Sequence, residues 1–135
     1  MVLDLFAGTG ALGLEALSRG AARVVFVDDG AKASVLIRQN IELTRSLDCA
    51  QLIRRNATRL GAAPGAQFDL VFLDPPYGKA LGEKALAEAQ QGGWLAPEAL
   101  IVWEENVEKH APHGFERLDA RRYGDTWVHV LRLAE

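Results

Sequence analysis

The chain has 135 residues and a mass of 14.7 kDa, which is the size of one domain and leaves no room for a second hydrophobic core. Hydrophobic residues make up 49% and charged residues 24%, a balance typical of a packed globular protein and not of a disordered one. The formal net charge of −3 does not indicate a nucleic-acid-binding protein, so any such function has to come from a local site. We predict a single domain over residues 1–135.

Three sequence features bear on where the protein works. Its apolar runs are far shorter than the ~20 residues that span a bilayer, so we expect no contact with a membrane. The N-terminus, from Met1 to Asp4, has no basic segment and no small-residue cleavage site, so we expect no secretory signal. The single cysteine, Cys49, cannot form an internal disulfide and fits a reducing compartment. We therefore expect a cytoplasmic protein, and we expect it to be a monomer.

The first half of the chain alternates predicted strands and helices. An apolar strand over residues 2–6 is followed by glycines and then by a helix over residues 11–19. A strand over residues 23–27 precedes a helix over residues 31–47, and a short strand follows over residues 51–55. The side chains of the second helix that we expect on one apolar stripe are Ala33, Leu36, Ile37, Ile41 and Leu47.

The second half continues this pattern and then changes it. Residues 68–73 are apolar on both faces, as in a central parallel strand. A helix over residues 80–91 and a strand over residues 99–103 come next, and residues 115–123 and 126–133 read as a hairpin. The pattern predicts an α/β fold with a mostly parallel sheet, helices on both faces and a C-terminal antiparallel hairpin.

A glycine loop follows the first predicted strand. Gly8, Gly10 and Gly13 have the spacing G-x-G-x-x-G, open a predicted helix, and precede Asp28 at the end of the next strand. Glycines allow a close approach of the backbone to a ligand, and a carboxylate at the second strand tip can accept hydrogen bonds from ribose hydroxyls. This arrangement suits any cofactor that contains adenosine.

The residue that distinguishes between such cofactors is Asp4, at the end of the first strand. Beside a pyrophosphate its charge would be repelled, at a cost on the order of 1–4 kcal/mol at about 4 Å. Beside the ammonium of an amino-acid tail it would be attracted, so the sequence favours S-adenosylmethionine over a dinucleotide. The run from Asp4 to Gly10 is similar to the first motif of Rossmann-like methyltransferases. We interpret the adjacent Asp29 as a solvated residue or a helix N-cap, not as a ligand.

A second motif follows the central strand. Asp74, Pro75, Pro76 and Tyr77 fall at the same sheet edge as the glycine loop, because parallel strands place their carboxyl ends together. The Asp74 carboxylate and the Pro75 carbonyl can accept hydrogen bonds from an amine, and Tyr77 can stack on a planar base. We interpret the motif as the catalytic site for methylation of an exocyclic amine. The motif alone does not separate guanine N2 from adenine N6.

Such a pocket takes only an unpaired or flipped base, so we expect a nucleic-acid partner. Lys79 lies just after Tyr77 and is our first candidate for a phosphate contact. The other basic residues considered are Arg54, Arg55, Arg59, Lys84, Arg121 and Arg122. Metal chemistry is not expected, since His110, His113 and His129 have no ligand spacing with Cys49.

Together these segments resemble the RsmD family of bacterial ribosomal RNA guanine-N2 methyltransferases. The resemblance is carried by residues 4–21, by the run from Phe72 to Tyr77, and by residues 93–96, and it extends over essentially the whole chain. It implies a Rossmann-like class I methyltransferase fold, S-adenosylmethionine as cofactor, and small-subunit ribosomal RNA or the small ribosomal particle as partner. The residues that it implies for the cofactor are Asp4, Phe6, Gly8, Gly10, Asp28, Asn56 and Ala57. Those that it implies for the guanine amine are Asp74, Pro75, Pro76 and Tyr77.

Members of that family normally carry a helix and a basic segment ahead of the first strand, whereas this chain begins on the strand. From this difference we expect weaker cofactor binding and loss of RNA docking, while the fold is kept because the predicted sheet is all present. Gly30, where the family often has an acidic or polar residue, is expected to matter little. The alternatives are an adenine-N6 or other nucleic-acid amino-methyltransferase, and a remnant that binds cofactor without turnover. A dinucleotide-dependent oxidoreductase is disfavoured by Asp4 and by the chain length.

Overall fold

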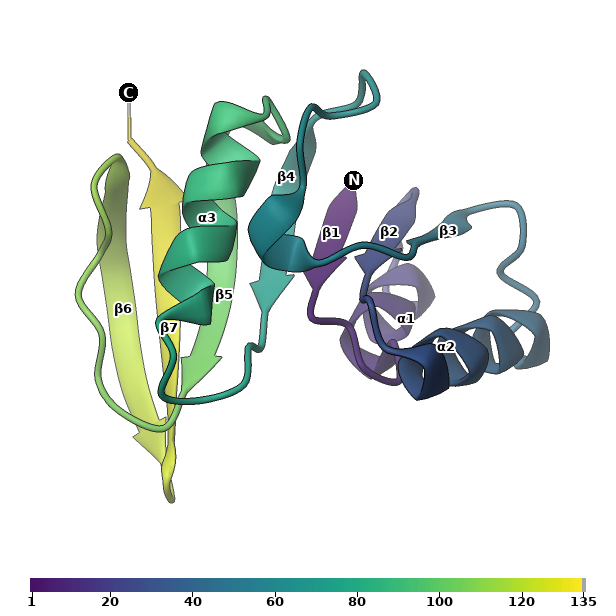
Figure 1. The fold of residues 1–135 in the computed structure, drawn as a ribbon, viewed down its shortest axis with the longest axis horizontal. Helices are drawn as coiled ribbons and strands as arrows, with labels where there is room; N and C mark the ends of the chain where they lie inside the picture. Colours follow the sequence, from purple (N-terminus) through teal and green to yellow (C-terminus); the bar gives the residue numbers. More distant parts are fainter. Residues whose placement is uncertain (135) are drawn as a thin grey trace.

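The protein is built on one sheet of seven strands. A computed structural model describes residues 1–134, and its strands lie side by side in the order β3-β2-β1-β4-β5-β7-β6 (Figure 1). The strands are β1 (Val2–Leu5), β2 (Val24–Val27), β3 (Ala50–Ile53), β4 (Phe68–Leu73), β5 (Leu95–Glu105), β6 (Phe115–Tyr123) and β7 (Thr126–Leu133). The helices are α1 (Ala11–Ser18), α2 (Ala31–Leu43), the short 3₁₀ helix η1 (Ala57–Arg59) and α3 (Leu81–Gln91).

The first five strands are parallel, and the last two form an antiparallel hairpin. Strand β1 lies between β2 and β4, and β4 pairs in parallel with β5. Strand β7 pairs antiparallel with both β5 and β6. The chain runs outward from β1 to β3 and then crosses back to β4, so the strand order reverses between β1 and β4. Ligands of open α/β sheets bind at the carboxyl ends of the strands at such a point.

Helices cover both faces of the sheet, and two groups of buried side chains result (Figure 1). Helices α1 and α2 pack on one face against Val24 and Phe26 of β2. Helix α3 and η1 pack on the other face, over a larger core that contains Trp94 and Trp103. The predicted architecture, a mostly parallel sheet with a C-terminal hairpin, is confirmed.

The glycine loop is shaped by packing as well as by backbone conformation. Gly10 begins α1 with a φ of 79°, in the left-handed region that favours glycine. A Cβ atom on Gly13 would lie 2.4 Å from the ring of Phe26 and 2.8 Å from Val24. Only glycine therefore allows α1 to sit this close to β2, and the closeness brings the first turn of α1 onto the end of β1.

The second helix ends earlier than its sequence pattern predicts. It stops at Leu43 because Arg45 adopts a φ of 56°, and the Ser46 N–H donates to the Ile41 carbonyl. This is a helix-ending motif that usually has glycine in the place of Arg45. The expected stripe is wrong at two positions, since Leu36 and Leu47 are 42% and 69% exposed. Ser34, Ile37 and Ile41 form the buried face instead.

Strand β5 is longer than predicted. It starts at Leu95, before Pro97, although the apolar run begins only at Ala99. Leu95 pairs with Phe68, and the register shifts before Leu100 pairs with Leu70, so the strand continues through an irregularity. Among residues 1–134, no helix is long and apolar enough to cross a membrane.

Candidate functional site

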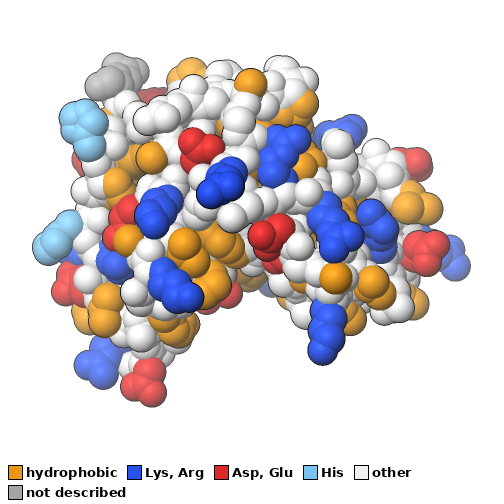
Figure 2. Space-filling model, viewed as in Figure 1, with side chains coloured by type: hydrophobic (Ala, Val, Ile, Leu, Met, Phe, Trp, Pro, Cys, Tyr) orange, Lys and Arg blue, Asp and Glu red, His pale blue; other side chains and the backbone are white. Residues whose placement is uncertain are grey.

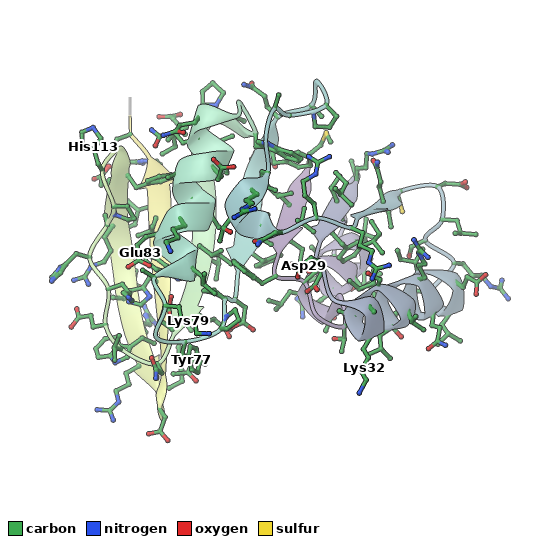
Figure 3. All side chains as sticks on the ribbon, viewed as in Figure 1. Asp29, Lys32, Tyr77, Lys79, Glu83 and His113 are labelled. Carbon is green, nitrogen blue, oxygen red and sulfur yellow. The ribbon has the colours of Figure 1, made fainter. Side chains whose placement is uncertain are left out.

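A cleft of about 420 Å³ opens at the carboxyl edge of the sheet, where the strand order reverses. One side of its wall comes from the ends of β1 and β2, and the other from the segment after β4. Figure 3 labels Asp29 from the first side and Tyr77 from the second. The wall consists of Phe6, Val27, Asp28, Asp29, Ala57, Asp74, Pro75, Pro76 and Tyr77.

Asp28 is held in place by the backbone on both sides. Its Oδ2 accepts a hydrogen bond from the Gly8 N–H at 3.0 Å, and its Oδ1 accepts one from the Gly30 N–H at 2.8 Å. An ionised carboxylate has about four acceptor positions, so about two remain for a ligand. Gly8 has a φ of 61°, and a Cβ there would meet open space, so the loop leaves room for a ligand beside Asp28. The arrangement suits the two hydroxyls of a ribose.

Asp4 lies beneath this loop and is almost fully buried, with 2% of its surface exposed. Its Oδ2 accepts a hydrogen bond from the Gly13 N–H, at the start of α1, at 3.0 Å. Burial raises the pKa of Asp4 to about 7; the bond from Gly13 opposes the rise, and the charges of Asp74 and Asp28 add to it. A positively charged ligand near Asp4 would stabilise its ionised form.

The motif from Asp74 to Tyr77 follows β4 directly and forms the other side of the cleft. Pro75 is buried, which anchors the segment, while Tyr77 is 46% exposed and available to a planar ligand. Loss of surrounding water raises the pKa of Asp74. The segment therefore presents a carboxylate, a backbone carbonyl and an aromatic ring in a stiff turn. Lys79 is exposed two residues beyond Tyr77.

The segment after β3 contributes less than the sequence suggests. Ala57 lies in the wall of the cleft. The Asn56 side chain caps η1, because its Oδ1 accepts hydrogen bonds from the Thr58 N–H at 2.9 Å and the Thr58 hydroxyl at 2.8 Å. The amide nitrogen of Asn56 and the backbone of Ala57 are the groups left for a ligand.

The structure brings most of the predicted site residues to one place. Phe6, Asp28, Ala57 and the four residues of the second motif line the cleft. Asp4, Gly8 and Gly10 lie outside the wall and fix its shape through the bonds and turns just described. Sequence reasoning missed Val27 and gave Asp29 no part in the site, although both line the cleft. The cap role considered for Asp29 is wrong, because Gly30 is the N-cap of α2 and no side chain caps it.

His129 lies within a strand and is not placed to act as a base. This agrees with the prediction from its strand position. His129 is fully buried; its Nε2 accepts a hydrogen bond from the Lys109 N–H at 2.8 Å, so its Nδ1 carries the proton that faces the Trp103 carbonyl at 3.1 Å. Burial lowers the pKa of His129. Both ring nitrogens are thus used to fix the segment after β5. Within the described residues, no three His, Cys, Asp or Glu side chains gather as metal ligands.

Comparison with known proteins decides the family. The family model described as Conserved hypothetical protein 95 matches residues 1–132. The chain belongs to the Conserved hypothetical protein 95 family. The RsmD resemblance seen in the sequence is thereby confirmed.

The curated relatives that match the chain carry methyltransferase names. The chain is 39% identical over 110 residues to "Ribosomal RNA small subunit methyltransferase D" of Escherichia coli K12, a match that covers 82% of this chain and 55% of that protein. It is 36% identical to "Putative rRNA methyltransferase YlbH" of Bacillus subtilis, over 96% of this chain and 74% of that protein. The chain thus spans about half the length of the first of these relatives and about three quarters of the second.

A solved structure similar to this chain has the same fold. The putative methylase HI0767 of Haemophilus influenzae superimposes with a TM-score of 0.88 at 32% identity, covering 99% of this chain and 86% of that one. The Rossmann-like methyltransferase fold is therefore established for residues 1–134.

Proposed function

We propose that the protein transfers a methyl group from S-adenosylmethionine to the exocyclic N2 amine of a guanine in small-subunit ribosomal RNA. The observation that carries the proposal is one cleft lined on one side by Asp28 and on the other by Asp74 and Tyr77. A carboxylate suited to a ribose thereby faces an acceptor suited to an amine. The family membership and the names of the relatives support the same chemistry.

The residues present fit the cofactor. Asp28 has acceptor positions left for the ribose hydroxyls, and the open space at Gly8 lets the backbone approach the ligand. Asp4 is a buried carboxylate without a cationic partner among residues 1–134, and the ammonium of the amino-acid tail would supply one. Phe6 and Ala57 offer apolar surface for the adenine. When bound, S-adenosylmethionine supplies an electrophilic methyl group on a positively charged sulfur.

The motif after β4 then prepares the amine. The lone pair of an exocyclic amine is delocalised into its base ring, and acceptors aimed at the two N–H groups favour the geometry in which it is available. In the proposal, Asp74 and the Pro75 carbonyl accept these N–H groups, and Tyr77 stacks on the base. The N–C bond forms as the S–C bond breaks, and the proton that the nitrogen then loses leaves to water. No strong general base is required.

Exposed basic residues support RNA as the partner. In the C-terminal hairpin, Arg117, Arg121 and Arg132 each bind an acidic neighbour, while Arg122 donates a hydrogen bond to the Gly124 carbonyl. Six exposed basic side chains in the segments that follow β2, β3 and β4 make no ion pair with residues 1–134; they are Lys32, Arg54, Arg55, Arg59, Lys79 and Lys84. Figure 2 shows Lys and Arg side chains spread over this face. In Figure 3, Lys79 and Lys32 lie on opposite sides of Asp29. In the proposal, such cations bind phosphates on both sides of a base held in the cleft.

Calorimetric titration with S-adenosylmethionine, with NADH as the control ligand, tests the cofactor. Binding of S-adenosylmethionine alone supports the proposal. Binding of NADH alone, or binding of neither ligand, would contradict it.

Replacing Lys79 by glutamate tests the RNA surface. We expect Lys79→Glu to weaken binding to small-subunit RNA and to reduce the dependence of affinity on salt, while leaving cofactor affinity unchanged. The matched control is Arg23→Glu, an exposed position ahead of β2 at the opposite edge of the sheet from the cleft. Equal effects of the two variants on RNA affinity would remove Lys79 from the RNA-binding surface.

A further inference from the structure

A second carboxylate, Glu104, lies next to Asp74 at the carboxyl edge of the sheet. Strands β4 and β5 are parallel here, and Leu73 is the register partner of Trp103. Asp74 and Glu104 are the next residues of the two strands, so they stand at the same level. Leu73, Trp103 and Glu105 are buried on the α3 side. Because successive strand residues face opposite sides, Asp74 and Glu104 share the other side.

Glu104 has no partner in the part of the chain that the structure describes. Its neighbour Glu105 accepts a hydrogen bond from the Trp103 indole N–H at 2.9 Å and is buried. Glu104 is only half-buried, and no hydrogen bond or ion pair engages its side chain within residues 1–134. Its burial and the charge of Asp74 raise the pKa of Glu104, because both disfavour the ionised carboxylate. A hydrogen bond from an N–H donor would stabilise that ionised form. The position therefore offers a free acceptor beside the motif that receives the amine.

The placement of the two carboxylates at the ends of neighbouring strands suits one edge of a guanine. Neighbouring strands lie about 4.8 Å apart, so oxygens of the two side chains can converge on adjacent groups of one base. Guanine presents two adjacent kinds of donor on that edge, the N1–H and the N2 amine. Adenine presents an amine donor beside N1, which is an acceptor. Two neighbouring carboxylates thus fit the guanine edge and oppose the adenine edge.

We propose that Glu104 is a specificity-determining residue that accepts the N1–H of the target guanine while Asp74 and the Pro75 carbonyl hold its N2 amine. This inference rests on the function proposed above and accounts for what the Asp-Pro-Pro-Tyr motif alone leaves open, the choice of guanine over adenine. An adenine in the same pose would place its N1 lone pair against the Glu104 carboxylate. Discrimination of this kind is expected to be about 10- to 100-fold in kcat/KM.

A base analogue isolates the N1–H. The methylated nucleotide is first located by mass spectrometry of small-subunit RNA treated with the parent protein. A fragment around it is then synthesised with either guanine or 2-aminopurine at that position. 2-Aminopurine keeps the amine at C2 but has no hydrogen on N1. Methyl transfer to both fragments is measured for the parent, for Glu104→Gln, and for the control Glu98→Gln, an exposed position at the other end of β5.

We expect the parent and Glu98→Gln to prefer guanine over 2-aminopurine by about 10- to 100-fold. Glu104→Gln should lose most of this preference, because its amide can donate to the unprotonated N1 of the analogue. Cofactor affinity should stay the same in all three proteins. A parent that methylates guanine and a Glu104→Gln variant with the parental preference would overturn the inference alone. A parent that binds the cofactor but methylates no guanine would overturn the proposed function and, with it, this inference.

Discussion

Replacing Asp4 by asparagine is expected to stabilise the cofactor-free chain at pH 8. The Asp4 side chain is 2% exposed, and its one hydrogen bond comes from the Gly13 N–H. Asparagine has nearly the same shape, and its side-chain oxygen can accept the same bond. The substitution therefore removes a buried charge and keeps the packing.

The size of the effect follows from the pKa of Asp4, which rises from 3.8 to about 7 on folding. Between these values the unfolded chain has released the Asp4 proton and the folded chain has not, so stability falls as the pH rises. The full cost is present above pH 7 and amounts to at most about 4 kcal/mol. Asp4→Asn should raise the free energy of unfolding by about 2–4 kcal/mol at pH 8. At pH 5 the gain should be only about 1–2 kcal/mol, because only part of the cost of the buried charge is present there.

Urea unfolding at pH 5 and pH 8 measures this difference. Asp48→Asn, at an exposed position, serves as the control and should change stability little at either pH. A loss of stability in Asp4→Asn that is equal at both pH values would refute the reasoning, because it would show that the carboxylate is not a destabilising charge in the folded chain.

Three further substitutions test the site and the packing behind it. Asp74→Ala should lower methyl transfer to RNA by at least about 100-fold while calorimetry finds unchanged cofactor affinity; parental activity would contradict its role. Asp28→Ala should weaken S-adenosylmethionine binding by about 10-fold or more in calorimetry, since it removes ribose acceptors and frees the Gly8 and Gly30 N–H groups. Gly13→Ala should destabilise the fold by about 1–3 kcal/mol in urea unfolding, because its Cβ would overlap the Phe26 ring; parental stability would show that α1 can shift freely.

The order of elements could be predicted from the sequence because apolar period and glycine position dominate it. The mostly apolar run of β4 and the glycine loop between β1 and α1 identify the parallel sheet and its active edge. The end of α2 could not be predicted, because Arg45 takes a left-handed conformation that glycine usually adopts at this position. The early start of β5 depends on pairing with Phe68.

The residues of the candidate site could be predicted where a motif marks them, and not where only the fold does. Asp28 and Asp74 stand at the ends of recognisable strands, and both line the cleft. Asp29 looks like a surface residue in the sequence, but it lines the cleft beside Asp28 at the end of β2. Glu104 has no local signal at all, because its position beside Asp74 follows from the register of two strands that are distant in sequence. Chemistry that depends on neighbouring strands needs the structure.

Mass spectrometry of RNA nucleosides tests the central claim most directly. The chain is incubated with small-subunit RNA, or with the assembled particle, and with S-adenosylmethionine that carries a deuterated methyl group. The RNA is then digested to nucleosides. Our account predicts labelled N2-methylguanosine from the parent protein and none from Asp74→Ala. Label found only in N6-methyladenosine, or equal label with both proteins, would contradict it.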